Sequence, residues 1–250
     1  MLLPIDKVPA KVGNPRYLVI YGKPKTGKTT IVAAIPNNLI IDLEGGSEFM
    51  DSLAVQARNL VDLSAIAKAI KDKISETGKF PYKYITIDSG TVLEDIAKQY
   101  ALQLYQATPM AKDKVTGKIY NDDILKLPNG GGYYYLREAF DKIVSMFKVL
   151  CENFILVCHC KDNMINKEGR EMSEMTVDLS GKLARIVAAS SDAIGLVYRS
   201  GKKTYINFNG GSDSIVEARA PHLRGQEILI SEADDENNVT VNWEKLYLPE

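Results

Sequence analysis

A motif near the start of the chain constrains the fold more than any other feature. Residues 22–29 read Gly-Lys-Pro-Lys-Thr-Gly-Lys-Thr and fit the pattern G-x-x-x-x-G-K-[ST] of a phosphate-binding loop. An apolar segment, residues 17–21, precedes the motif, and a helical pattern over 29–35 follows it as far as Pro36. This order of strand, glycine-rich loop and helix predicts an anion-binding loop at a helix N-terminus.

The residue types in this loop predict binding of a nucleoside triphosphate together with Mg²⁺. Glycines allow backbone N–H groups to curl around an anion, and the helix N-terminus adds positive potential. We expect Lys28 to reach the β- and γ-phosphates and the Thr29 hydroxyl to bind the metal, whereas Lys23 and Lys25 are interpreted as solvated loop charges. The predicted cofactors are ATP and Mg²⁺, and the predicted nucleotide-binding residues are Gly22, Lys23, Pro24, Lys25, Thr26, Gly27, Lys28, Thr29 and Thr30.

Short apolar runs alternate with amphipathic patterns along the chain. The expected buried parallel strands are residues 17–21, 39–42, 84–88, 154–159 and 193–199. The expected helices are residues 29–35, 63–74, 91–106, 135–151 and 183–189. This alternation predicts an α/β fold with a mostly parallel central sheet flanked by helices and with ligands at the carboxyl ends of the strands. The later segments are expected to form antiparallel edge strands, residues 203–208, 214–218 and 239–243, with a turn at 209–211.

Length and composition favour one large soluble domain with a single core. The chain has 250 residues, of which 45% are apolar, and no apolar run approaches the ~18 to 20 residues of a membrane span. The first ten residues lack the apolar core of a signal peptide, and the odd number of cysteines (Cys151, Cys158 and Cys160) fits free thiols. We therefore expect a cytoplasmic protein with no membrane partner.

Charge divides the chain into two expected units, an ATPase domain over residues 1–230 and an acidic segment over 231–250. The acidic segment carries six carboxylates against one lysine, so its net charge is −5 and that of the remainder is +4. We expect this segment to pack as an edge strand or to remain a solvated tail.

Two further strand ends carry carboxylates. Asp88 ends the apolar run 84–88, a pattern that places a carboxylate beside the metal held by a phosphate loop. Asp42 closes the run 39–42, and Glu44 follows two residues later. Hydrolysis requires a water polarised in line with the γ-phosphate, and a carboxylate just past a strand end can reach it. We favour Glu44 as this base, Asp42 as a structural residue, and Thr29 with Asp88 as the metal-binding pair.

The order of these motifs resembles the RecA superfamily of ATP-dependent recombinases. The resemblance implies that Glu44 is the catalytic base. It also implies that His159, at the end of the fourth strand, senses the γ-phosphate and relays its presence to a DNA-binding loop. RecA-type proteins normally carry glutamine at that position, so the histidine departs from the pattern. The expected catalytic residues are Glu44, Lys28 and His159.

A narrower resemblance is to the compact phage and prophage relatives of RecA, the Sak-type annealing and recombination ATPases. It rests on residues 21–24, 42–46, 87–89, 158–161 and 178–182. The resemblance implies a bacteriophage protein in the bacterial host cytoplasm that binds single-stranded DNA during recombination or strand annealing. A single-strand-binding protein is a further expected partner.

Two long connections occupy the positions of the DNA-binding loops in RecA-like proteins, residues 107–132 and 161–179. The first contains Lys112, Lys114 and Lys118, which could pair with phosphates, and tyrosines 133–135 follow it, which could stack on bases. Acidic residues dilute both connections, so neither is a basic patch. Two interpretations of these tyrosines stay open: they stack on bases, or they pack against other side chains of the protein.

The resemblance also implies a homo-oligomer, a ring or filament with nucleotide at the subunit interface. Hydrolysis in such assemblies is completed by a cation from the neighbouring subunit. The sequence does not choose among the candidates Lys182, Arg185, Lys202, Lys203, Arg219 and Arg224.

Two alternative functions stay open. A P-loop kinase acting on a small molecule would need an arginine-bearing lid, and residues 107–132 contain no arginine. A nucleotide-gated scaffold for DNA or protein would scarcely hydrolyse ATP. A zinc site is not expected, because Cys158 and Cys160 point to one side of their strand and His159 to the other.

Overall fold

The computed structural model describes residues 13–167, 170–211 and 213–249, with the side chains of 165–167 and 170–172 left aside. The expectation for the first ten residues falls outside this range. The strands are β1 (Tyr17–Gly22), β2 (Asn38–Asp42), β3 (Ala54–Gln56), β4 (Tyr84–Asp88), β5 (Asn153–Lys167), β6 (Arg170–Val177), β7 (Ala193–Ser200), β8 (Lys203–Asn207), β9 (Glu217–Ala218), β10 (Glu227–Ala233) and β11 (Val239–Val241). The helices are α1 (Lys28–Ala33), α2 (Leu60–Thr77), α3 (Gly90–Gln106), α4 (Gly131–Lys148) and α5 (Leu183–Ser190). Short 3₁₀ turns are η1 (Gly46–Phe49), η2 (Pro109–Ala111), η3 (Ile124–Lys126), η4 (Pro128–Gly130) and η5 (Trp243–Lys245).

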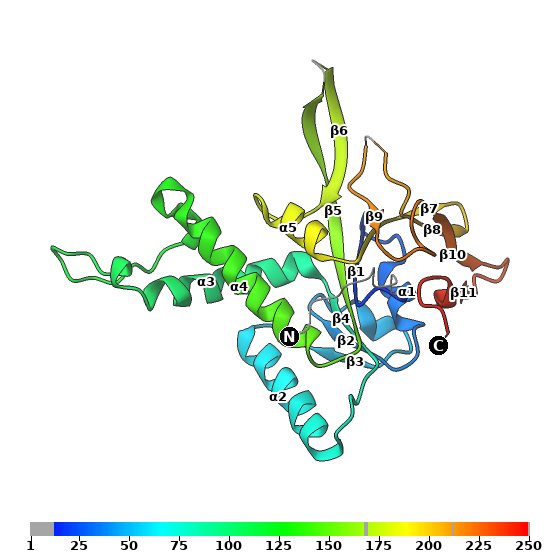
Figure 1. The fold of residues 1–250 in the computed structure, drawn as a ribbon, viewed down its shortest axis with the longest axis horizontal. Helices are drawn as coiled ribbons and strands as arrows, with labels where there is room; N and C mark the ends of the chain where they lie inside the picture. Colours follow the sequence, from blue (N-terminus) through cyan, green and yellow to red (C-terminus); the bar gives the residue numbers. More distant parts are fainter. Residues whose placement is uncertain (1–12, 168–169, 212, 250) are drawn as a thin grey trace, which may run out of the picture.

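One sheet runs through the molecule in the order β11-β10-β8-β7-β1-β5-β4-β2-β3 (Figure 1). From β7 to β3 the neighbouring strands pair in parallel, and β8, β10 and β11 extend the β7 edge with antiparallel pairs. The predicted α/β fold with a mostly parallel sheet flanked by helices is confirmed. The phosphate-loop strand β1 lies between β5 and β7, so the carboxyl ends of these strands meet at one edge of the sheet.

The single core expected from the length is divided by the sheet, because alternation along the central strands sends apolar side chains to one cluster on each face. Tyr17, Val19 and Tyr21 of β1 pack on one face with apolar side chains of α2, α3, α4 and α5. Leu18 and Ile20 pack on the other face with α1 and the C-terminal segment. Each fully buried aliphatic or aromatic side chain contributes about 1.5 to 3 kcal/mol to folding, so both cores hold the strand ends in place.

The acidic C-terminal segment is part of the folded body. β10 runs across position 230 and pairs with β8, and β11 pairs with β10. Beyond these strands the Tyr247 ring is buried against the Tyr84 ring, with a centroid separation of 4.8 Å. The Asn14 amide exchanges two hydrogen bonds of 2.8 Å with the Leu248 backbone, which fixes the end of the chain beside the start of β1.

Three features of the sheet differ from the sequence-based expectation. The connection 161–179 is a β-hairpin, because β5 continues to Lys167 and pairs with β6 in antiparallel register from Cys160↔Val177 outward. The expected pairing of 203–208 with 214–218 is wrong, because β8 pairs with β7 and β10 while β9 pairs with β7. β3 and β10 were not expected. β3 has only three residues and is half-exposed, and in β10 the apolar residues 228–230 are followed by Ser231 and Glu232, so neither has the longer apolar run that marks a buried strand.

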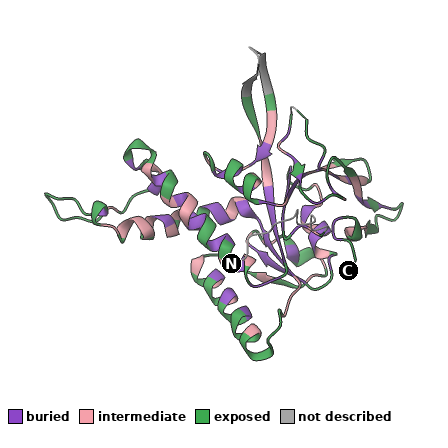
Figure 2. Cartoon of the chain, in the orientation of Figure 1, coloured by how far each residue is buried: buried purple, intermediate pink, exposed green. Residues whose placement is uncertain are grey.

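Figure 2 shows burial concentrated in the central sheet and on the inward faces of the helices. The α3–α4 connection and the described part of the β5–β6 hairpin extend away from this body (Figure 1). Within the described residues, no helix combines the length and apolar character that crossing a bilayer requires.

Candidate functional site

The glycine-rich motif forms the turn from β1 into α1. Gly27 precedes the helix with φ 92°, a left-handed conformation that side chains with a Cβ rarely adopt. The Lys28 side chain is only 6% exposed, and its ammonium donates hydrogen bonds of 3.0 and 2.8 Å to the Gly22 and Lys23 carbonyl oxygens. Burial lowers the pKa of Lys28, and the nearby Asp88 carboxylate opposes that shift. The phosphate loop therefore surrounds the ammonium group of its own lysine, Lys28.

Thr29 and Asp88 meet across the sheet edge. The Thr29 hydroxyl donates a hydrogen bond of 2.6 Å to Asp88 Oδ2, which joins the start of α1 to the end of β4. Burial raises the pKa of Asp88 to about 6, the charges of Glu44 and Asp42 add to this shift, and the Thr29 hydrogen bond and Lys28 oppose it. A hydroxyl beside a buried carboxylate is an oxygen donor set of the kind that Mg²⁺ prefers, so these residues fit the metal.

The raised pKa of Asp88 gives a prediction for the nucleotide-free protein in EDTA. The unfolded chain releases this proton near pH 3.8 and the folded chain near pH 6, so stability falls as pH rises between these values. At pH 7.5 the charged carboxylate costs on the order of 1 to 3 kcal/mol. We expect Asp88→Asn to raise the free energy of unfolding at pH 7.5 by about that amount.

This gain should vanish below about pH 4, where both states of the wild type are protonated. The same variant should lose the additional stabilisation that Mg²⁺ confers in the presence of nucleotide. Chemical unfolding at pH 7.5 and pH 3.5 measures the first effect. A variant less stable than the wild type at pH 7.5 would contradict the burial argument.

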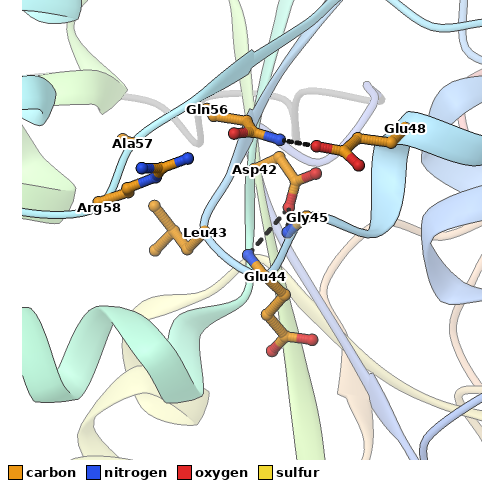
Figure 3. Close-up of a pocket in the computed structure, with 8 residues that line it drawn as sticks. All are labelled: Asp42, Leu43, Glu44, Gly45, Glu48, Gln56, Ala57 and Arg58. Atoms are coloured by element: carbon orange, nitrogen blue, oxygen red, sulfur yellow. Dashed lines mark hydrogen bonds between the residues drawn. The ribbon is translucent and has the colours of Figure 1, made fainter.

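The turn after β2 is organised by Asp42 (Figure 3). Its carboxylate accepts backbone N–H hydrogen bonds from Glu44, Gly45 and Ser47 at 2.9, 2.8 and 2.9 Å, and the Ser47 hydroxyl at 2.5 Å. Burial alone would raise the pKa of Asp42, but these hydrogen bonds outweigh it and lower the pKa. Asp42 is thus a structural residue that fixes the direction of the turn, and the Glu44 side chain points away from it (Figure 3).

Glu44 is held by residues of two other strand ends. The Ser89 hydroxyl, just after β4, donates to Glu44 Oε1, and His159 Nε2 on β5 lies 2.8 Å from the same oxygen. A carboxylate only accepts, so Nε2 carries the proton. His159 Nδ1 is buried without a hydrogen-bond partner among the described residues. The side chains of His159 and Glu44 are 26% and 33% exposed, so both remain open to solvent on one side.

These groups line one cavity of about 440 Å³ at the carboxyl ends of the strands. Of the predicted site residues, it is lined by Pro24, Lys25, Gly27, Lys28, Thr29, Thr30, Glu44, Asp88 and His159. Met50 and Arg199 also line it, and neither was among the predicted site residues. Ser89 was missed as well, although its position directly after a strand-end aspartate is a signal that sequence inspection could use.

A second cavity, of about 350 Å³, borders the same turn. Figure 3 shows its lining, in which the Gln56 amide donates a hydrogen bond of 2.5 Å to Glu48. Its walls come from the end of β2, from η1 and from the residues after β3. Glu44 therefore lines two cavities, and residues of the phosphate loop line the first of them and not the second.

Backbone contacts connect His159 to two projecting segments. Its N–H donates to Thr91 Oγ1 at the start of α3 (3.2 Å), and its carbonyl accepts from the Asp178 N–H after β6 (2.9 Å). Lys161 donates a 2.5 Å hydrogen bond to the Leu179 carbonyl. These contacts join the cavity end of β5 to the start of α3 and to the residues that follow β6.

The segments predicted to contact DNA lie on these projections. Lys112, Lys114 and Lys118 are exposed on the α3–α4 connection. Tyr133 and Tyr134 are exposed in the first turn of α4, whereas Tyr135 is half-buried and packs on Tyr105 at 5.2 Å between ring centroids. In the second connection, 161–179, Lys161 and Asp162 belong to the described part of the β5–β6 hairpin. The side chains of residues 165–172 are not among the described ones.

The candidate intersubunit cations differ in their contacts. Lys202 pairs with Asp235 at 2.7 Å and Lys203 with Glu232 at 3.4 Å. Arg219 lies 3.7 Å from Asp192, and Arg224 donates to the Ala218 and Arg219 carbonyls. Lys182 and Arg185 are exposed and form no ion pair within the described part of the chain.

Comparison with known proteins identifies the class. The family model described as an AAA domain matches residues 14–215, and the chain belongs to this family. It is therefore of the P-loop AAA-type ATPase class, for which nucleotide binding is the expected activity. The search of curated proteins gives no match. No group of three or more His, Cys, Asp or Glu side chains within the described residues is arranged to hold a metal ion.

Proposed function

We propose that the protein is a Mg²⁺-dependent ATPase of RecA-like, Sak type, encoded by a phage or prophage. In this proposal the nucleotide state controls binding of single-stranded DNA during recombination or strand annealing. The observation that carries the ATPase proposal is the convergence of Lys28, the Thr29–Asp88 pair and Glu44 on one cavity.

Each group has a distinct role in the proposed hydrolysis. Lys28 and the loop N–H groups bind the phosphates, and Thr29 and Asp88 hold Mg²⁺, which would neutralise charge on the transferred phosphoryl group. Glu44 accepts the proton of the attacking water at its carboxylate. Ser89 and His159 orient that carboxylate through Oε1, which leaves Oε2 for the water. The strand end that carries His159 lies between the phosphate loop and Asp88.

The DNA part of the proposal is supported by the position of the projecting segments and by the resemblance to RecA-like proteins. His159 sits between the cavity and backbone contacts that lead to both segments. Exposed lysines on the α3–α4 connection and exposed Tyr133 and Tyr134 offer phosphate pairing and base stacking. We propose a ring or filament in which Lys182 or Arg185 completes the neighbouring site, since the other candidate cations are engaged within their own subunit.

Phosphate release measured with and without a single-stranded oligonucleotide tests this function. We expect release that requires Mg²⁺ and rises several-fold with oligonucleotide. We expect a triple variant, Lys112→Ala, Lys114→Ala and Lys118→Ala, to retain basal release and to bind oligonucleotide more weakly. The salt dependence of its binding should also fall, by about 0.7 in logarithmic slope per lost phosphate contact.

A matched control removes the same charge from α2 with Lys68→Ala, Lys71→Ala and Lys73→Ala, three exposed lysines away from the proposed interface. This control should bind oligonucleotide as the wild type does. If the rate of phosphate release is the same with and without oligonucleotide, and no salt-dependent binding of oligonucleotide is found, the recombination proposal fails. The proposed nucleotide site is unaffected by that result.

A nucleotide-gated scaffold is the second candidate, favoured by one contact. Glu44 is already engaged by Ser89 and His159, so a state in which the base is held away from water is consistent with the geometry. Normal nucleotide binding without any phosphate release, in the presence and absence of oligonucleotide, would favour this function over the ATPase.

A further inference from the structure

The wall of the phosphate loop opposite the carboxylates is formed by the β7–β8 hairpin. β7 pairs with β1 on the side away from β5, with Gly22 beside Val197. A Cβ on Gly22 would lie 2.3 Å from the Val197 carbonyl oxygen, and one on Gly27 would lie 3.7 Å from Thr204 Oγ1. Both ends of the loop therefore lie close against this hairpin, and the space beside Gly27 is bounded by its residues.

Arg199 lies at the carboxyl end of β7 in this wall. It pairs with Thr204 in the hairpin register and lines the cavity of the phosphate loop. Its Nε donates to the Gly201 carbonyl at 3.1 Å, and no carboxylate of the described residues forms an ion pair with it. The neighbouring Lys202 and Lys203 are each paired, so among the cations of this wall that the structure describes it is Arg199 that keeps its terminal donors available.

The geometry of the cavity fixes which end of a nucleotide would meet Arg199. Glu44, Asp88 and His159 lie on the side where the γ-phosphate must be for hydrolysis. On the β7 side of the phosphate loop, Gly27, Thr30 and Arg199 line both this cavity and a neighbouring one. From there a small hollow of about 60 Å³ continues between α1 and the antiparallel strands, lined by Thr204, Ser231 and Val239 among others. The α-phosphate and the nucleoside thus belong on the Arg199 side.

We infer that Arg199 binds the α-phosphate of the nucleotide from within the same subunit. A guanidinium presents a planar fork of donors that matches phosphate oxygens, and it stays charged at all working pH values. This inference rests on the proposed nucleotide site. It gives the antiparallel edge of the sheet a role in ligand binding. Arg199 is then distinct from the cation that a neighbouring subunit would supply for hydrolysis.

Calorimetric titration of Arg199→Ala with a nonhydrolysable ATP analogue and with ADP tests the assignment. We expect both ligands to bind about 10- to 100-fold more weakly than to the wild type, by the same factor, because both carry an α-phosphate. Arg199→Lys keeps the charge without the fork and should recover part of the loss. Lys68→Ala, which removes an exposed cation of α2, should leave both affinities unchanged.

Three outcomes would overturn the assignment. Unchanged affinities in Arg199→Ala would show that the arginine does not bind the ligand. A loss confined to the triphosphate analogue would move the contact to the γ-phosphate. Absence of binding by the wild type would remove the proposed nucleotide site together with the inference. Because Arg199 is exposed and its side chain donates, within the described residues, to a turn carbonyl, the variant should unfold at the wild-type temperature, which a thermal scan checks.

Discussion

Replacement of Lys28 by alanine is expected to weaken binding of a nonhydrolysable ATP analogue by at least about 100-fold, or ~2.7 kcal/mol. The ammonium is buried at the centre of the loop and already donates to two of its carbonyls. Contacts between a buried cation and phosphate oxygens contribute about 1.5 to 3 kcal/mol each. Calorimetric titration measures the loss.

Lys142→Ala provides a matched control for Lys28→Ala. Lys142 is a cation of α4 that pairs with Glu138 at 2.9 Å, and its removal should leave nucleotide affinity unchanged. Thermal unfolding must show that both variants are folded. An affinity for the analogue in folded Lys28→Ala within a factor of three of the wild type would contradict the assignment of the phosphate loop.

The second large effect is expected for Glu44→Gln. The amide keeps the shape of the side chain but cannot take a proton from water, so the rate of phosphate release should fall by about 10²- to 10⁴-fold. Affinity for the ATP analogue should stay within a few-fold of the wild type, because Glu44 does not hold the phosphates. Single-turnover phosphate release and analogue titration separate the two effects.

Glu48→Gln is the matched control for this change. Glu48 is a second carboxylate of the same turn, but it accepts a hydrogen bond from Gln56 and lines the other cavity. Its replacement should leave phosphate release unchanged. Comparable losses in the two variants would indicate a general disturbance of the turn, and a normal rate in Glu44→Gln would assign the base elsewhere.

Sequence patterns were sufficient for the elements that enclose the site. The apolar runs ending in Asp42 and Asp88 mark buried strands, and the glycine motif fixes the connection from β1 to α1. Parallel strands bring their carboxyl ends to one edge, so the closeness of Thr29 and Asp88 follows from the order of motifs.

Other features depend on contacts that local pattern does not record. β5 continues beyond His159 with mostly polar residues. Its backbone N–H and C=O groups pair with β6 in a hairpin that projects from the body, so this part of the strand needs no apolar face. The pairing of Glu44 with Ser89 and His159 joins residues from three strand ends. Arg199 enters the site only because β7 lies beside β1, which no motif in the sequence specifies.

Calorimetric titration of the full chain with a nonhydrolysable ATP analogue, with and without Mg²⁺, tests the central claim most directly. The claim is that the loop between β1 and α1 binds a triphosphate, with Thr29 and Asp88 holding the metal. It predicts saturable binding of one nucleotide per chain that is stronger with Mg²⁺ than in EDTA, and loss of that Mg²⁺ effect in Asp88→Asn. Absence of binding under both conditions, or binding that Asp88→Asn leaves equally dependent on Mg²⁺, would contradict it.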